Sequence, residues 1–186
     1  MIIGENISFV PYCKHHVEKY HKWMQDKGLQ LLTASEPLTL NEEYEMQLSW
    51  QNDEDKLTFI AIIGNSIPKT VEEEIDRMIG DINLFFIFSP DIAEINMMVA
   101  ENKFRRGGLG SEMLNLIMSY AVDHLNISKF SAKISNSNQP SINFFQKNNF
   151  ILESVSEVFQ ETNFELLAKN ATPYTYAKID YPFSPL

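Results

Sequence analysis

Short apolar runs alternate with amphipathic stretches along this chain, and the two patterns predict different elements. Runs rich in β-branched and aromatic residues predict strands, which cover residues 7–11, 56–63, 77–88, 94–100, 129–134, 150–154 and 158–167. Apolar residues at helical spacing predict helices over residues 15–25, 41–51, 111–125 and 141–148. Asn41 is the expected N-cap of the second helix. The predicted order is therefore βααβββαβαββ.

The segments between these elements carry turn and loop signals. The first helix is expected to end before Gly28, and residues 35–39 and 89–91 are expected to form turns. Residues 64–76 are polar and acidic and contain a proline, which predicts a solvated, mobile loop. We assign residues 1–168 to one domain. Residues 169–186 hold several prolines and tyrosines and are expected to form an extended arm that packs on the domain or on a neighbour.

Length and composition are those of a globular domain. The chain has 186 residues, of which 44% are hydrophobic and 22% charged, so a single core can form without disulfides or metals. No apolar run approaches the roughly 20 residues that cross a bilayer. Residues 1–5 lack a basic stretch followed by an apolar core. We therefore expect a cytoplasmic or nuclear protein that has no membrane partner and acts as a monomer or weak dimer.

The number and spacing of the cysteines and histidines do not match a metal-binding site. Cys13 is the only cysteine, which rules out an internal disulfide and suggests a packing thiol. The four histidines lack the Cys/His spacing of a zinc site. No metal is expected.

The charge balance is acidic, with a formal net charge of −10. Nucleic acids and anionic membranes are bound by positive fields, so neither is an expected partner. A cationic or neutral partner is favoured. The alternative is that the negative surface serves only solubility.

The most informative stretch is residues 105–110, Arg-Arg-Gly-Gly-Leu-Gly, between a predicted strand and a predicted helix. The first N–H groups of a helix have no intrahelical partner and carry the positive end of its dipole, so a phosphate suits them. Gly107, Gly108 and Gly110 remove the Cβ atoms that would hold a diphosphate away. Arg105 and Arg106 can add charge-assisted hydrogen bonds. This stretch therefore predicts an anion site.

Two nucleotide motifs fail on this stretch. A Walker loop needs a lysine before Ser111, and a dinucleotide fingerprint needs a third glycine where Met113 stands. The remaining pattern, R-x-x-G-x-G over residues 105–110, resembles the acyl-coenzyme A pyrophosphate motif of the GNAT superfamily of N-acetyltransferases. An ordinary glycine-rich turn is the alternative.

A second pattern in the correct order supports this resemblance. Residues 138–150 resemble the superfamily's N-x-x-[AS]-x-x-x-[YF]-x-x-x-G-F, with Asn138, Ser141, Phe145 and Asn149 at the motif positions. Further stretches resemble the N-acetyltransferase 9 branch of the superfamily, so that the likeness runs from about residue 10 to residue 167. These stretches are residues 32–40, 43–44, 46–47, 49–51, 58–60, 80–85, 140–142, 145–147 and 158–161.

The resemblance implies the α+β GNAT fold, a splayed central mixed sheet flanked by helices, with acetyl-coenzyme A in the gap. Backbone groups of Met98 and Val99 would pair with the pantetheine arm like an added strand. An amide near Val99 would hold the thioester carbonyl. The cofactor-binding residues implied are Met98, Val99, Arg105, Arg106, Gly107, Gly108, Leu109, Gly110, Ser111, Asn138, Ser141 and Phe145.

Glu94 is the candidate catalytic base, because it stands where the resemblance places an acidic or tyrosyl base. Asn96 points to the same face by the period-two rule. Lys133 stands where some relatives carry a histidine that cooperates with the base. The alternative is that Glu94 and Lys133 form a salt bridge across the sheet.

Departures from the family pattern leave the general acid open. Phe145 replaces the tyrosine thought to protonate the leaving thiolate, so that this help is absent, comes from water, or comes from Tyr44 or Ser141. Asn149 replaces a glycine, which is mild because Asn tolerates left-handed backbone. On the acceptor side, Glu36 could bind an α-ammonium, or it is simply an acidic turn residue. Tyr44 is a further candidate for substrate contact.

The first hypothesis is an acetyl-coenzyme A-dependent transferase acting on protein amino termini by direct attack of the amine on the thioester. The resemblance to the N-acetyltransferase 9 branch implies the amino termini of α- and β-tubulin as acceptors. One alternative is acetylation of a small amine or a lysine side chain. Another is an acyl-coenzyme A-binding or microtubule-associated module with little turnover.

Overall fold

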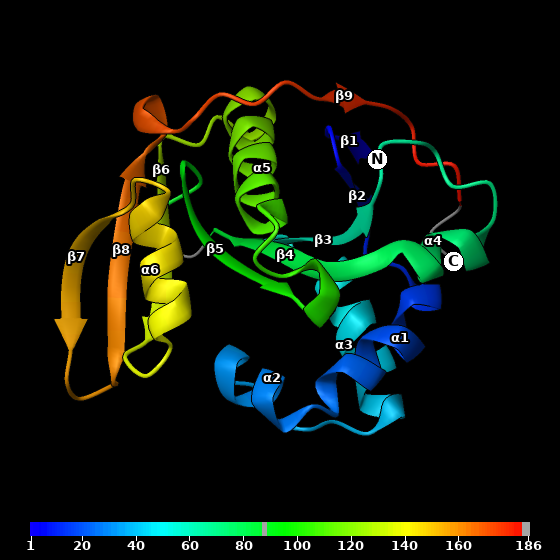
Figure 1. The fold of residues 1–186 in the computed structure, drawn as a ribbon, viewed down its shortest axis with the longest axis horizontal. Helices are drawn as coiled ribbons and strands as arrows, with labels where there is room; N and C mark the ends of the chain where they lie inside the picture. Colours follow the sequence, from blue (N-terminus) through cyan, green and yellow to red (C-terminus); the bar gives the residue numbers. More distant parts are fainter. Residues whose placement is uncertain (87–88, 184–186) are drawn as a thin grey trace.

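The computed structural model describes residues 1–86 and 89–183, and within these residues the strands form one nine-stranded sheet (Figure 1). Its order is β7-β8-β6-β5-β4-β3-β2-β1-β9. The strands are β1 (Ile2–Ile3), β2 (Ile7–Pro11), β3 (Lys56–Ile63), β4 (Met78–Phe85), β5 (Ile92–Val99), β6 (Lys129–Ser135), β7 (Ile151–Ser156), β8 (Glu161–Leu167) and β9 (Ala177–Lys178).

Helices lie on both faces of this sheet. They are α1 (Val17–Met24), α2 (Lys27–Thr33), α3 (Leu40–Gln51), α4 (Val71–Arg77), α5 (Leu109–Leu125) and α6 (Gln139–Lys147). Helix α5 lies on one side of the central strands and α1 and α3 on the other (Figure 1). Two cores result, one around Phe9 and Phe130 and the other around Tyr20 and Met98. Among the described residues, no helix has the length and apolar character to cross a bilayer.

The sheet opens between β5 and β6, as the predicted splay requires. These strands pair in parallel only over residues 92–94 and 129–131. Beyond that point β5 continues to Val99 against β4, and β6 continues to Ser135 against β8. The predicted α+β fold with a splayed mixed sheet is confirmed.

Strands 7–11 and 56–63 begin and end where the sequence predicts. The strand predicted over 77–88 ends at Phe85, and its last two residues lie outside the described residues. Helix α5 begins at Leu109 rather than Ser111, because Gly108 is its N-cap.

The first predicted helix ends before Gly28, as expected, with Met24 as its last residue. The sequence reasoning missed the next helix, α2, which starts because the Asp26 carboxylate accepts hydrogen bonds from the N–H groups of Gly28 and Leu29. Two local predictions were wrong. Helix α3 is capped by Thr39 rather than Asn41, and Glu42 completes a capping box. The expected loop over residues 64–76 contains most of α4, which Thr70 caps.

The C-terminal segment crosses helix α5 and returns to the sheet (Figure 1). Tyr174 donates to Glu112 and Tyr176 to Asp123, both on α5. Strand β9 then pairs with β1. The segment thus packs on the domain itself.

Candidate active site

The glycine loop leads from β5 into α5 and leaves a helix N-terminus open. Gly108 has φ +89°, a backbone conformation that favours glycine. No side chain caps the helix, and the first intrahelical bond runs from the Glu112 N–H to the Gly108 carbonyl at 3.1 Å. A Cβ at Gly107 or Gly108 would meet no atom within 4 Å. This open cradle, with Leu109 and Ser111 in the first turn, fits the diphosphate of coenzyme A.

Gly110, the third glycine of the loop, allows two helices to pack closely. A Cβ at Gly110 would lie 3.4 Å from the ring of Phe144 on α6. Helices α5 and α6 therefore approach each other closely at this point. Gly110 serves helix packing as well as the loop.

The two arginines of the motif are placed differently. Arg105 donates from Nε to the Val99 carbonyl at 2.7 Å and from Nη2 to the Ala100 carbonyl at 3.2 Å. Arg106 is exposed, with φ +62°. Arg105 thus joins the loop to the end of β5. It uses the carbonyl oxygen of Val99 and leaves the Val99 N–H group available to a ligand. Arg106 is the arginine that faces solvent.

The second motif starts helix α6. The Asn138 side-chain oxygen accepts from the Ser141 N–H at 3.2 Å, which caps the helix. Its amide nitrogen donates to the Leu32 carbonyl at the end of α2, also at 3.2 Å. Asn149 has φ +68°, in line with the expected tolerance of Asn for this conformation. Phe145 is buried, with ring centroids 5.2 and 5.0 Å from Phe144 and Phe150, so its ring contributes to the core.

Glu94 and Lys133 meet at the point where the sheet opens. Glu94 belongs to the last residue pair that joins β5 and β6. Its Oε2 lies 2.9 Å from Lys133 Nζ, so the salt bridge considered as an alternative is present. An open pocket of about 370 Å³ adjoins this pair and is lined by Ile92, Glu94, Lys129, Ser131, Ala132, Lys133, Glu153 and Asn163. A molecule in this pocket would lie next to Glu94.

The other predicted residues lie on the same side of the sheet or beside it. Asn96 is exposed on β5, and Met98, also on β5, is buried in the core under α1. Glu36 is exposed in the loop between α2 and α3. Tyr44 lies on α3, half-buried against the same core as Met98. Of the predicted catalytic and acceptor residues, Glu94 and Lys133 form an ion pair.

Sequence reasoning missed a buried polar row on β3 and β4. Thr58 Oγ1 donates to Asn83 Oδ1 at 2.7 Å, and Asn83 Nδ2 donates to Asp81 Oδ2 at 2.9 Å. Burial raises the pKa of the Asp81 carboxyl to about 6. The signal in the sequence was the presence of Asp and Asn at alternate positions of an otherwise apolar strand.

Lys56 lies near this row. Its Nζ is 2.8 Å from the centroid of the Trp50 ring, a cation–π contact. Burial lowers the pKa of Lys56 to about 7. The nearby Asp81 carboxylate opposes this shift.

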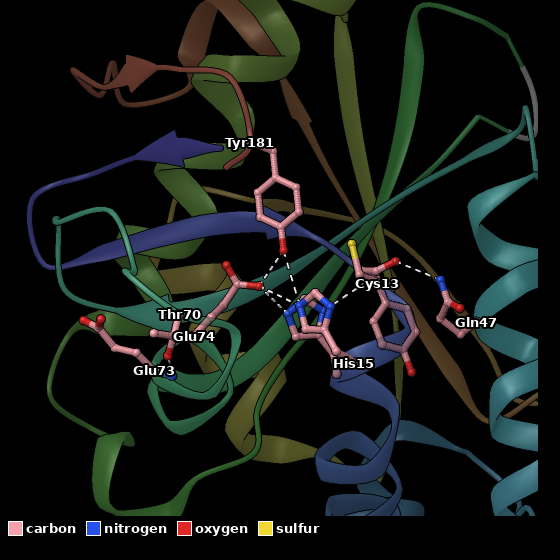
Figure 2. A network of polar contacts seen from close by, with 9 residues as sticks. Cys13, His15, Gln47, Thr70, Glu73, Glu74 and Tyr181 are labelled. Atoms are coloured by element: carbon pink, nitrogen blue, oxygen red, sulfur yellow. Dashed lines mark hydrogen bonds and ion pairs between the residues drawn. The ribbon is translucent and has the colours of Figure 1, made fainter. Parts of the chain in front are cut away.

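One group of metal-ligand types occurs in the described residues, formed by His15, His16 and Glu74 (Figure 2). The Cys13 N–H donates to His16 Nδ1 at 3.0 Å, so His16 Nε2 carries the proton that it donates to Glu74 at 2.8 Å. Tyr181 also donates to this carboxylate oxygen at 2.5 Å. Hydrogen bonds thus account for the group, which holds the C-terminal segment against α4.

Comparison with known proteins gives consistent matches. Residues 6–151 match the family described as acetyltransferase (GNAT) domain. The chain is 47% identical over 171 residues to mouse alpha/beta-tubulin-N-acetyltransferase 9, covering 89% of this chain and 70% of that protein. It is 43% identical to an N-acetyltransferase 9-like protein of Nematostella vectensis, covering 97% of this chain and 93% of the relative.

Solved structures share the fold at low sequence identity. Spermidine N-acetyltransferase from Vibrio cholerae, in complex with coenzyme A and spermine, superposes with a TM-score of 0.74 at 14% identity, covering 89% of this chain and 97% of that one. An aminoglycoside acetyltransferase in complex with coenzyme A superposes with a TM-score of 0.71 at 14% identity, covering 88% and 96%.

Proposed function

This chain belongs to the GNAT family of N-acetyltransferases and to its N-acetyltransferase 9 branch, and from that premise we propose that it acetylates protein amino termini with Glu94 as the base. The chain is an N-acetyltransferase, and acetyl-coenzyme A is its acetyl donor. The finer proposals are the acceptor class and the roles of individual residues.

The observation that carries the proposal is the position of Glu94 at the vertex of the splay. The open stretch of β5 beyond it ends in the glycine loop, where Gly107 and Gly108 leave room for a diphosphate. Glu94 lines an open pocket on the sheet. An acceptor amine in that pocket would lie next to both a proton acceptor and the gap between β5 and β6.

Acetyl-coenzyme A supplies an activated acetyl thioester to this gap. An amine reaches the protein mostly as an ammonium at neutral pH, and Glu94 accepts its proton directly or through a water molecule. Lys133 Nζ, 2.9 Å from Glu94 Oε2, fixes the direction of the carboxylate. Phe145 has no proton to donate to the leaving sulfur, so solvent in the open pocket supplies it.

Two observations support a protein amino terminus as the acceptor. The mouse relative is named for α- and β-tubulin, and we extend that acceptor to this chain. The net charge of −10 attracts a positively charged amino terminus at long range. We propose further that the enzyme works in the cytoplasm.

The test measures coenzyme A release with peptides that have a free or a blocked α-amine, a lysine-bearing blocked peptide, and spermidine. Wild type is compared with Glu94→Gln and with Glu165→Gln. Glu165 is a matched control, because it pairs with Lys129 on the same sheet at 3.3 Å. We expect turnover only with free α-amines, lost in Glu94→Gln and kept in Glu165→Gln.

Other outcomes would select the alternatives. Turnover with spermidine or with the blocked lysine peptide would move the acceptor to small amines or side chains, as the fold-level likeness to a spermidine N-acetyltransferase allows. Equal activity of Glu94→Gln and wild type would remove Glu94 from the reaction. An absence of turnover together with thermal stabilisation by acetyl-coenzyme A would indicate a binding module with low turnover.

A further inference from the structure

The hydrogen bonds of the buried polar row on β3 and β4 all run in one direction, from Thr58 through Asn83 to Asp81. The Thr58 hydroxyl donates to the Asn83 carbonyl oxygen, and the Asn83 amide nitrogen donates to the Asp81 carboxylate. Asp81 is 3% exposed and Asn83 is 4% exposed. If the Asn83 side-chain amide were turned by 180°, its oxygen would face the Asp81 carboxylate oxygen, and two acceptors would meet. The charge of Asp81 therefore fixes the orientation of this amide.

Folding alone gives a poor reason for a carboxylate at this position. An ionised carboxyl loses its hydration when it is buried. Tyr20 also donates to Asp81 Oδ2 at 3.4 Å and the Lys56 ammonium lies near, but burial outweighs these partners and raises the pKa of Asp81. Asparagine has the same shape and could still accept from Asn83. A charge kept at a cost in stability is typical of functional sites.

The register of β4 and β5 places this row beside the candidate base. Asn83 pairs with Asn96, and two residues along, Phe85 pairs with Glu94. Paired residues of antiparallel strands point to the same face, with Cβ atoms about 5 Å apart. Asn83 is therefore adjacent to Asn96, which is exposed on the face where Glu94 lies.

We propose that Asp81 is a positioning residue for the acceptor amine, acting through the Asn83 amide on Asn96. The inference rests on the proposed function, because it takes the face of Glu94 and Asn96 as the acceptor side. An ammonium that approaches Glu94 passes Asn96, whose side-chain oxygen can accept from it. Asn83, which its hydrogen bonds to Thr58 and Asp81 hold in one orientation, is the paired neighbour that limits the positions of that side chain. The buried Asp81 charge, partly offset by Lys56, adds a negative potential.

The ligand class is thus a primary amine that arrives protonated. Asp81 takes no part in bond making and lies outside the coenzyme A cradle of Gly107 and Gly108. Its loss is expected to affect acceptor binding and to spare the donor.

The experiment compares steady-state kinetics of wild type, Asp81→Asn and Thr58→Val. Thr58→Val removes the donor that holds Asn83 from the other side. Thr162→Val is the matched control, because Thr162 Oγ1 donates to Asn136 Oδ1 with the same length of 2.7 Å. Thr162 lies two residues from Phe164 on the same strand and therefore points to the same face, which carries the core of Phe164 and Leu166. This face is opposite the one on which Glu94 and Asn96 lie.

We expect the KM for the acceptor to rise about tenfold in Asp81→Asn and severalfold in Thr58→Val. The KM for acetyl-coenzyme A and the thermal shift it produces should match wild type. Thr162→Val should leave the acceptor KM unchanged. All constants are measured with whichever amine class wild type acetylates, so a failure of amino-terminal specificity leaves this test valid.

Three results would overturn the proposal. The first is an unchanged acceptor KM in Asp81→Asn. The second is a fall in kcat alone. The third is a parallel rise of both KM values with a lower melting temperature, which would assign Asp81 a structural role only.

Discussion

Arg105 Nε lies 2.7 Å from the carbonyl oxygen of Val99, so the arginine of the phosphate-binding motif also holds the end of β5. A second bond to Ala100 reinforces this contact. Arg106, by contrast, is exposed. Arg105 therefore shapes the loop, and we propose that the exposed Arg106 attracts the donor.

Replacing these arginines should separate the two tasks. Arg105→Met should lower the free energy of unfolding by about 1–3 kcal/mol, because two partly buried carbonyls lose a charged donor, and it should also weaken acetyl-coenzyme A binding. Arg106→Met should weaken binding without loss of stability, and more so at low salt. Urea unfolding and calorimetric titration measure both quantities. Equal loss of stability in both variants would refute this division.

Alanine at the two open glycines should distinguish backbone strain from ligand space. Gly108→Ala forces φ +89° on an alanine and should cost about 1 kcal/mol or more. Gly107→Ala meets open space and should leave stability near that of wild type. Both should weaken acetyl-coenzyme A binding, because each methyl group enters the diphosphate cradle. Unchanged donor affinity in both variants would place the diphosphate elsewhere.

Asp81→Asn should make the protein more stable while it impairs acceptor binding. Burial raises the pKa of Asp81 from 3.8 to about 6, so the ionised form destabilises the fold progressively as pH rises through that range. The variant should gain about 1–3 kcal/mol at pH 8 and less at pH 5. Urea unfolding at both pH values measures the gain. A loss of stability at pH 8 would show that the hydrogen bonds of the carboxylate outweigh its desolvation.

The group around Glu74 should make stability fall in acid. Burial alone would raise the pKa of Glu74, but hydrogen bonds from His15, His16 and Tyr181 outweigh it and lower this pKa to about 2. This stabilisation is complete above the unfolded value of 4.5 and is lost as pH falls toward 2. Burial also lowers the pKa of His16, so stability begins to fall below the unfolded value of 6.5.

Tyr181→Phe tests this pH dependence. The variant removes one of the hydrogen bonds that lower the pKa of Glu74, so the decline in stability below pH 4.5 should become shallower. Tyr176→Phe is the control, because its hydroxyl donates to Asp123 on α5 at 2.8 Å and not to Glu74. Urea unfolding between about pH 3 and 8 follows both variants. Identical acid profiles for Tyr181→Phe and wild type would contradict the assignment.

The sequence was sufficient for elements whose boundaries follow from local chemistry. Strand β3 is a run of apolar and β-branched residues, and helix α6 follows the capping residue Asn138. It was insufficient where one side chain reverses a local signal. Asp26 starts a helix despite Gly28, and Thr39 caps α3 one residue before the first helical residue.

The candidate site was predictable only in part, because motifs locate residues along the sequence but do not show which residues come into contact in the fold. The positions of Glu94 and Lys133 were predicted, and their contact is a property of the β5–β6 register. Asp81 was missed because a buried carboxylate is recognised only by the residues around it. Its neighbour Asn83 is held by Thr58, which lies 25 residues away in the sequence. The contact of Asn138 with Leu32 joins segments 106 residues apart.

The splay also gives this sheet an unpaired strand edge in its interior. Exposed strand edges at the periphery of a sheet invite other chains to add a strand and aggregate. Beyond Glu94, the inner edges of β5 and β6 face each other, and the gap between them widens from a closed vertex. We expect the narrow end to exclude a guest peptide strand, because its side chains need room, and to accept a thin linear ligand without side chains. The gap in which we propose that the donor lies would thus also limit self-association at this edge.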